Sequence, residues 1–155
     1  MDITEWSRDD FIISTDRSKI DVNIVHQFLS RSYWAEGITK ETVQRSIDHS
    51  LCFGVYHHEQ TVGFARVISD FTTFAYLADV FILPEYRGKG LSKWLMQVII
   101  DHPELQGLRR FTLATKDAHG LYAQFGFTLF DRPDRWMQKH DPDVYRKTRN
   151  DKPKE

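Results

Sequence analysis

The chain has 155 residues, and its 21 basic and 22 acidic side chains give a formal net charge of −1 at pH 7. A chain of this length is the usual size of one domain, and it can bury a single hydrophobic core. Because the charges nearly cancel, the composition favours neither a nucleic acid nor an anionic membrane as a partner, and any anion site must be local. We therefore expect no nucleic-acid and no membrane partner.

The N-terminal residues and the single cysteine indicate a cytoplasmic protein. The first residues, MDITEWSRDD, contain no apolar signal region, and the longest apolar runs are too short to span a bilayer. Cys52 is the only cysteine, which excludes an internal disulfide, and we interpret it as a small buried apolar residue. Residues 1–140 are predicted to form a single domain. Residues 141–155 are predicted to form a charged tail, whose last segment, RKTRNDKPKE, should fray because it lacks large apolar residues.

The first half of the chain predicts a strand, two helices and a three-stranded antiparallel unit. FIIS, near Phe11, is typical of a short strand. Apolar residues recur at helical spacing from Ile20 to Ser30, and a second helix should begin at Thr39, whose hydroxyl can cap it. Two β-rich runs separated by a polar turn predict a hairpin, and a third run ends at Pro84, which cannot donate to a strand ladder. These three runs are residues 51–56, 62–68 and 72–83.

The second half predicts two more helices and further strands. Helical spacing predicts a helix from Leu91 to Asp101, and a shorter helix over residues 117–125, capped by Asp117 and stopped by Gly126. Strands are expected at 109–115 and 127–130. The last apolar run, 135–137, is compatible with an additional edge strand.

The turn LPEYRGKGLS, residues 83–92, lies between a predicted strand and a predicted helix. The first amides of a helix have no intrahelical acceptors, and the helix dipole adds positive charge at that end. Gly88 and Gly90 allow close approach of a ligand, and Arg87 and Lys89 add full charges, so the turn favours a phosphate or pyrophosphate. The alternative is an ordinary turn with solvated cations. The spacing matches neither a P-loop nor a Rossmann fingerprint, which leaves coenzyme A as a good candidate.

Two stretches, DVFILPEYRGKGLSKWLM and GLYAQFGF, resemble the GNAT N-acetyltransferase superfamily. The acyl-CoA signature of that superfamily, [QR]-x-x-G-x-[GA], is matched by Arg87, Gly90 and Ser92, with serine as a small residue in the last position. The order of predicted elements is similar from about residue 11 to residue 138. The resemblance implies an α/β fold whose mixed, mainly antiparallel sheet is flanked by helices and contains one splayed parallel strand pair.

The resemblance also implies acetyl-CoA as the cofactor. The central strand would pair with the pantetheine arm through its backbone, and the turn amides would hold the pyrophosphate. Many members carry an asparagine where this chain has Thr115, so a hydrogen bond from that position to the arm would be weaker or absent. The implied cofactor-binding residues are Val80, Phe81, Ile82, Arg87, Gly88, Lys89, Gly90, Leu91, Ser92 and Thr115.

Two residues are candidates for proton transfer. Tyr122 lies four residues before Gly126, as in the superfamily, where this tyrosine protonates the coenzyme A thiolate; a phenol can do so if it is held in contact. The alternative is a tyrosine that packs beside Phe125. Asp79 could act as the base, directly or through water, or could have a structural ion-pair role. Some polyamine-acetylating relatives have a Glu-Asp pair where this chain has Ala78 and Asp79, so their proposed base is missing here.

The acceptor should enter over the loop between the first two helices and the tips of the middle strands. Aromatic residues with one or two charges suit a small charged amine, although the same residues could cover the edge of the core or an interface. The candidate substrate-binding residues are Tyr33, Trp34, Glu36, Arg66, Asp70, Phe74 and Tyr76.

Three histidines are interpreted as structural or solvent-exposed residues and not as metal ligands or catalytic groups. His57 and His58 lack an accompanying cysteine or acidic cluster at a metal-ligand spacing, so we assign them to a hairpin turn and expect no metal. His119 is interpreted as a solvated or capping residue.

Two functions of different class therefore remain open. The first is an acetyl-CoA-dependent N-acetyltransferase that moves the acetyl group to a primary amine of a small molecule or peptide, by direct attack in a ternary complex. The second is a non-catalytic acyl-CoA-binding or regulatory module of the same fold. Apolar residues near the C-terminus, such as Trp136 and Met137, fit either a homodimer or a closed monomer core.

Overall fold

The computed structural model describes residues 1–146. Six strands form one sheet in the order of the sequence, and every neighbouring pair is antiparallel except the last, β5 with β6, which is parallel. The strands are β1 Glu5–Arg8, β2 Phe11–Ser14, β3 Leu51–His57, β4 Gln60–Ser69, β5 Phe74–Ile82 and β6 Arg110–Leu113. The mixed sheet with one parallel pair is the predicted fold class.

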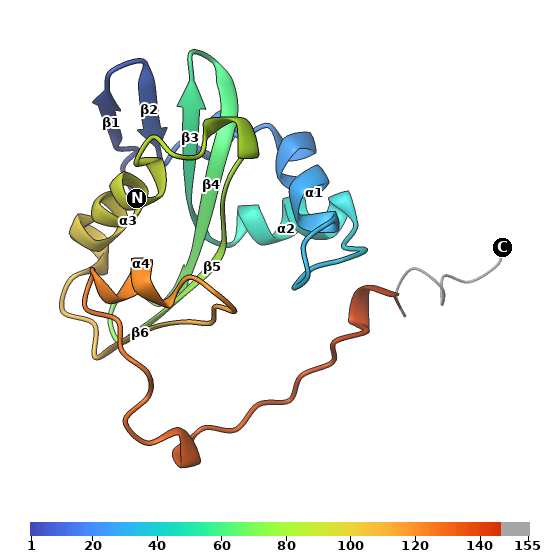
Figure 1. The fold of residues 1–155 in the computed structure, drawn as a ribbon, viewed down its shortest axis with the longest axis vertical. Helices are drawn as coiled ribbons and strands as arrows, with labels where there is room; N and C mark the ends of the chain where they lie inside the picture. Colours follow the sequence, from blue (N-terminus) through green and yellow to red (C-terminus); the bar gives the residue numbers. More distant parts are fainter. Residues whose placement is uncertain (147–155) are drawn as a thin grey trace, which may run out of the picture.

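Helices cover both faces of this sheet (Figure 1). The α-helices are α1 Val22–Ser30, α2 Lys40–Asp48, α3 Leu91–Asp101 and α4 His119–Ala123. Short 3-10 turns are η1 Arg17–Lys19, η2 Pro84–Tyr86, η3 Pro103–Leu105 and η4 Pro133–Arg135. Thr39 caps α2 by accepting from the Thr42 amide, which confirms the predicted start of the second helix. The first helix starts two residues later than its apolar pattern, and Asp21 caps it by accepting from the Asn23 amide.

The two faces have separate apolar cores because side chains alternate along the strands. On β3, Phe53 and Val55 belong to the larger cluster, which α3 covers, whereas Cys52 belongs to the second cluster beneath α1 and α2. Cys52 is buried, and burial raises the pKa of its thiol to about 12, in agreement with the structural role predicted for it.

Three sequence-based expectations for the second half are wrong. Residues 127–130 form no strand, and residues 135–137 contain the end of η4 instead of an edge strand. The rings of Phe130 and Trp136 stack at 4.3 Å and the Arg110 guanidinium lies 4.8 Å from the Trp136 ring, so side-chain contacts hold this segment near the start of β6. The short helix is not capped by Asp117. It begins after Ala118, whose amide donates to Thr115 Oγ1.

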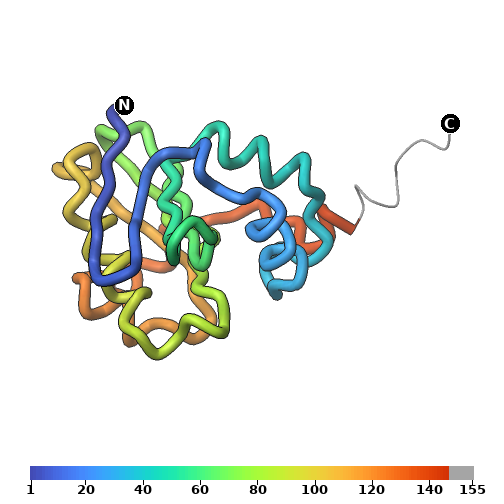
Figure 2. Tube along the Cα trace, turned by 90° about the horizontal axis from the view of Figure 1, so that it is seen from above, coloured from blue at the N-terminus to red at the C-terminus, as the bar shows by residue number. Residues whose placement is uncertain are grey.

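The chain beyond α4 leaves the sheet and runs to the side of α1 and α2 (Figures 1 and 2). Tyr145 packs there against the second apolar cluster. The predicted fraying of the last segment falls on residues that lie outside the described part, apart from Arg146. Among residues 1–146, no helix combines the length and the apolar character that crossing a bilayer requires.

The buried His102 predicts a pH-dependent stability. Its Nδ1 accepts from the Glu104 amide, its Nε2 has no hydrogen-bond partner in the described chain, and burial lowers its pKa. Because the unfolded chain takes up the proton first, this histidine should reduce stability as the pH falls below about 6.5, by at most about 1.4 kcal/mol per pH unit.

Urea unfolding of the parent and of a His102→Asn variant at pH 7.5 and pH 5.5 checks this prediction. Asparagine keeps an acceptor for the Glu104 amide without a group that titrates in this range. The parent should lose about 1 kcal/mol more than the variant on acidification. An equal loss in both proteins would contradict the prediction.

Candidate functional site

The parallel strands β5 and β6 separate at their C-terminal ends. Their pairing runs from Phe74 opposite Arg110 to Leu77 opposite Leu113, whereas β5 continues to Ile82. A cleft of about 600 Å³ opens where they part. We call it the splay cleft; it is lined by residues 76–80 and 113–118, by Tyr33, Trp34, Arg66 and Tyr122, and by residues of α2 and the C-terminal segment.

The end of β5 offers unpaired backbone to this opening. The Leu83 amide donates to Val62 O on β4 at 2.8 Å. The N–H and C=O of successive residues point to opposite sides of a strand, so the N–H and C=O of Ile82 point away from β4. Ile82 O accepts from Arg87 Nε at 3.0 Å, which fixes the Arg87 side chain beside the strand. The Ile82 amide is thus placed to pair with an extended ligand, while the Phe81 side chain is buried in the second cluster.

A bulge in β5 positions Asp79. The register with β4 shifts between Phe64 and Arg66, and Asp79 has a φ of 55°, a conformation that non-glycine residues seldom adopt. The simple alternation of side chains expected across Ala78 and Asp79 therefore does not hold. The bulge turns the Asp79 carboxylate toward Arg66 of the neighbouring strand.

Both oxygens of Asp79 already accept hydrogen bonds. Oδ2 is 2.9 Å from Arg66 Nε, and Oδ1 is 2.9 Å from Trp34 Nε1. The ion pair is largely buried, since the Arg66 and Asp79 side chains are 16% and 10% exposed, and Arg66 Nη1 also donates to Ser50 Oγ. These contacts favour the structural alternative for Asp79, because its carboxylate is held in a largely buried ion pair and has a donor on each oxygen.

Tyr122 lies on α4 and lines the splay cleft. Its side chain is buried, and burial raises the pKa of its phenol. No hydrogen bond of its hydroxyl to another group is found within residues 1–146. The structure thus presents a neutral phenol, with its proton still available, at the point where β5 and β6 separate.

The glycine-containing turn follows β5 directly. Gly88 and Gly90 have φ values of 79° and 77°, which glycine adopts without steric cost, and Gly90 is the residue before α3. The first helical bond runs from the Trp94 amide to Gly90 O, so the amides of Leu91 and Ser92 precede the ladder and remain open to a ligand. Such a helix start is a favourable place for an anion.

The turn has a cation that the sequence did not indicate. Arg8 of β1 reaches it: a Cβ atom on Gly90 would lie 3.4 Å from Arg8 Nη2, and the same guanidinium lies 5.8 Å from the Trp94 ring. Arg8 stands 82 positions before Gly90 in the sequence, and only the pairing within the sheet brings it there. Arg87 and Lys89 are exposed beside it.

The predicted acceptor residues divide into two groups. Tyr33, Trp34, Arg66 and Tyr76 line the splay cleft, and Glu36 lines a smaller adjoining cleft of about 210 Å³ together with Tyr33 and Trp34. The other two candidates, Asp70 and Phe74, lie at the opposite end of β5.

Asp70 closes the turn between β4 and β5. Its carboxylate accepts from the amides of Thr72, Thr73 and Phe74, and these bonds, that of Thr73 first, hold its pKa well below the usual range. Phe74 pairs with Arg110 at the start of β5. Neither residue lines the splay cleft.

Two predicted cofactor contacts, Thr115 and Val80, line the splay cleft, whereas His119 does not. Thr115 lines the splay cleft, but its hydroxyl oxygen already accepts from the Ala118 amide at 3.0 Å. Val80 lines the cleft beside the bulge. His119 is exposed, and it borders a second cleft that follows the outer edge of β6.

Tyr145 is a residue of the cleft that the sequence did not reveal. It lies in the C-terminal segment predicted as a charged tail, yet it lines the splay cleft near Asp79 and Arg66. Burial raises the pKa of its phenol, and the Asp79 carboxylate raises it further. The only signal in the sequence was an aromatic side chain within an otherwise polar stretch.

Comparison with known proteins identifies the family. Residues 3–127 match the family described as acetyltransferase (GNAT). A Gibberella zeae protein named as an acetyltransferase is 32% identical over 142 residues, which cover 77% of this chain and 79% of that protein. The mixed sheet with its splayed strand pair, and the glycine turn before α3, are thus found in a chain that matches acetyltransferases. The chain belongs to the acetyltransferase (GNAT) family.

Solved structures agree with this fold. A Xanthomonas campestris pv. campestris structure, named as an acetyltransferase of the GNAT family, is 54% identical with a TM-score of 0.86, covering 87% of this chain and 96% of that chain. A Clostridium acetobutylicum structure, named as an acetyltransferase with acetyl-CoA, has a TM-score of 0.60 and covers 90% of this chain and 95% of that chain. At 14% identity, it shows likeness of fold alone.

Proposed function

We propose that the protein is an acetyl-CoA-dependent N-acetyltransferase that moves the acetyl group to a primary amine of a small molecule or peptide. The observation that carries this proposal is the association of three features with the strand pair β5 and β6: the strands part, the glycine-containing turn follows β5 directly, and the buried neutral phenol of Tyr122 lines the cleft between them. The parted strands would admit the thioester, the turn would bind the pyrophosphate, and the phenol would protonate the leaving sulfur.

Acetyl-CoA fits the open side of β5. Its pyrophosphate would bind the amides of Leu91 and Ser92 with the charges of Arg87, Lys89 and Arg8 nearby. The amide-rich pantetheine arm would pair with the Ile82 amide and continue past Val80 into the splay cleft. The thioester would then lie near Tyr122, between the two strands.

The reaction forms a C–N bond and breaks a C–S bond. Protons must leave the amine nitrogen, and one proton must reach the sulfur. The amine nitrogen attacks the thioester carbonyl carbon to form a C–N bond, and collapse of the tetrahedral intermediate breaks the C–S bond, with the electron pair leaving on sulfur. Tyr122 donates its proton to that sulfur and is reprotonated from solvent. The amine is protonated at neutral pH, so it loses one proton before the attack and a second as the amide forms, each to water or to a base in the cleft.

We assign Asp79 a positioning role in this reaction. Because its carboxylate accepts from both Arg66 and Trp34, it holds a guanidinium and an indole at the wall of the acceptor side. Tyr33 and Tyr76 add aromatic surface to the same wall. Such a wall suits a small amine that carries an additional polar or anionic group, which the Arg66 side chain would attract.

A second function has one observation in its favour. The Asp79 carboxylate, one candidate for the base, is held by Arg66 and Trp34, as expected for a non-catalytic acyl-CoA-binding module. Calorimetric titration with acetyl-CoA, followed by an assay of thiol release with a panel of amines, separates the alternatives. Binding with amine-dependent thiol release supports the enzyme. Binding without release supports the module, and no binding by the folded protein would overturn both.

We also propose that two copies of the chain form a homodimer through β6 and the C-terminal segment. β6 is the last strand of the sheet, and a cleft of about 840 Å³ lies between its outer side and residues 125–131. In this C-terminal segment, Leu129 is 79% exposed and Met137 is 97% exposed. A second copy could add its own 127–137 segment to the β6 edge, and symmetry would bury both segments reciprocally.

Light scattering coupled to gel filtration tests this dimer. The parent should have the mass of two chains, and the double variant Leu129→Asp with Met137→Asp should have the mass of one, because two carboxylates cannot be buried unpaired in the contact. Ile3→Asp is the matched control, since Ile3 is also exposed but belongs to another surface. A parent that has the mass of one chain at all concentrations would contradict the dimer and show that the segment makes contacts only within its own chain.

A further inference from the structure

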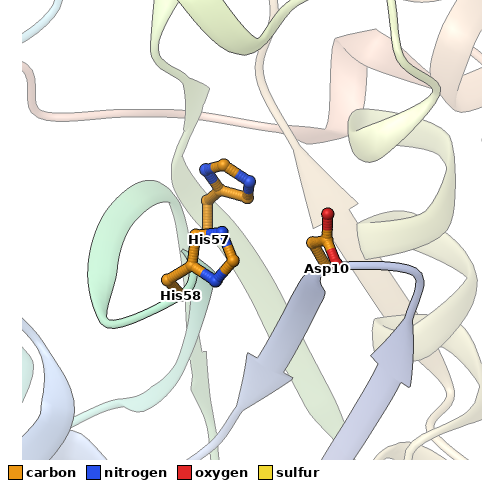
Figure 3. Close-up of side chains that lie close together, drawn as sticks. All are labelled: Asp10, His57 and His58. Atoms are coloured by element: carbon orange, nitrogen blue, oxygen red, sulfur yellow. The ribbon is translucent and has the colours of Figure 1, made fainter.

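Two hairpin turns bring an aspartate and two histidines together. His57 ends β3 and His58 follows it in the turn to β4, whereas Asp10 lies in the turn between β1 and β2. Because β2 pairs with β3, Phe11 stands opposite His57, and the residue before Phe11 is carried to the same end of the sheet. Figure 3 shows the three side chains gathered at this point from the two turns.

The geometry suits a shared ligand. One ligand atom from each of the three side chains, a carboxylate oxygen or an imidazole nitrogen, lies within 4.8 Å of the other two. In a tetrahedral site with bonds of about 2.0 Å, ligand atoms are separated by about 3.3 Å. Asp10 and His58 are exposed, so rotation of their side chains can close the remaining gap without disturbing the core.

The ring of His57 is held in place by its neighbours. It stacks on Phe11 at 4.8 Å, and lies 5.4 Å from the Tyr86 ring and 4.3 Å from the His58 ring. These are ring contacts, which leave the nitrogen lone pair free. Throughout residues 1–146, no other group forms a hydrogen bond or ion pair with the side chains of Asp10, His57 or His58.

We propose that Asp10, His57 and His58 form a binding site for a divalent transition-metal ion, with Zn²⁺ as the ion to test. Two imidazole nitrogens and one carboxylate oxygen are ligands that Zn²⁺ accepts, and an exposed site leaves its fourth position to water. Mg²⁺ and Ca²⁺ prefer sites built only of oxygen atoms, so they are poor candidates. The expectation of no metal rested on spacing within one segment and missed Asp10, which lies far away in the sequence.

The bound ion would tie the first hairpin to the middle of the sheet. β1 and β2 form the edge of the sheet opposite β6, and a metal link from Asp10 to the β3–β4 turn would fasten their connecting turn to the third strand. Metal that binds only the folded chain stabilises it by mass action. This inference does not depend on the proposed acetyl transfer, because the three residues lie outside the splay cleft.

Calorimetric titration of the full chain with ZnCl₂, after removal of any affinity tag and treatment with a chelator, tests the site. The parent should bind one equivalent of Zn²⁺. Asp10→Asn and His58→Gln, both at exposed positions, should each weaken binding by about tenfold or more, since loss of even an outer partner of a zinc ligand costs 10–100-fold. Circular dichroism establishes that both variants remain folded.

His49→Ala is the matched control, because His49 is an exposed histidine on another part of the surface. Its affinity for Zn²⁺ should equal that of the parent. A melting temperature that rises with ZnCl₂ in the parent and in His49→Ala, but not in Asp10→Asn, would give independent support. The proposal is overturned by a parent that binds no Zn²⁺, by variants that bind as the parent does, or by equal weakening in His49→Ala.

Discussion

Replacement of Gly90 by aspartate should weaken acetyl-CoA binding by about 100-fold or more, because like charges brought together in an interface cost several kcal/mol. Gly90 lies at the start of α3, where the open amides of Leu91 and Ser92 would hold the pyrophosphate. A carboxylate at this position would repel the pyrophosphate. It would also attract Arg8, since a Cβ on Gly90 would lie 3.4 Å from Arg8 Nη2.

Gly90→Asn is the matched control for the shape of the new side chain. Asparagine and aspartate have nearly the same size, and both tolerate the left-handed conformation that Gly90 adopts with a φ of 77°. Calorimetry with acetyl-CoA should show a far smaller loss for Gly90→Asn than for Gly90→Asp. Equal losses would mean that space, and not charge, governs the turn, and an unchanged affinity in both would place the pyrophosphate elsewhere.

The sequence predicted the fold where local chemistry and neighbouring pairing decide it. Thr39 caps the helix that it was expected to start, and the hairpin around His57 and His58 forms as its polar turn indicated. The order from β3 to β5 follows because consecutive antiparallel strands need only short turns. β1 was missed, since EWSR is short and polar and becomes a strand only through its pairing with β2.

The errors near the C-terminus share one physical cause. Residues 127–130 and 135–137 have β-forming composition, but a strand also requires a partner edge at the right place. In the described chain the side chains of Phe130 and Trp136 pack on each other and on Arg110 instead. Local composition cannot distinguish a strand from a segment held by such contacts, because both expose apolar residues to a neighbour.

The candidate site was predictable where a motif lay within one segment. The glycine turn and Tyr122 each belong to a continuous stretch; the turn follows β5 directly, and Tyr122 lines the splay cleft. Arg8, Tyr145 and Asp10 could not be assigned from the sequence, because each reaches its place through strand pairing or through the path of the C-terminal segment. The direction of the Asp79 side chain depends on the bulge in β5, and no local sequence pattern predicted that bulge.

Replacement of Tyr122 by phenylalanine should lower the turnover number by about 10²- to 10⁴-fold with little change in acetyl-CoA affinity, because general acid catalysis contributes about that factor. The Tyr122 phenol lines the splay cleft, and burial raises its pKa, so the proton remains in place through the neutral and mildly alkaline range. The parent rate should therefore not fall through ionisation of this phenol until the pH exceeds about 10. Thiol release with the best amine of the panel, measured against pH, gives both results.

Tyr56→Phe is the matched control, since it removes a buried phenol hydroxyl on β3, outside the splay cleft, that has no hydrogen-bond partner among residues 1–146. It should retain the activity of the parent, because loss of an unsatisfied buried hydroxyl costs little stability. If Tyr122→Phe also kept the parent rate, the thiolate would be protonated by solvent, and Tyr122 would serve only to fill the space where β5 and β6 part. A selective loss in Tyr122→Phe with unchanged cofactor affinity would require that the hydroxyl act after acetyl-CoA is bound, as the acid role demands.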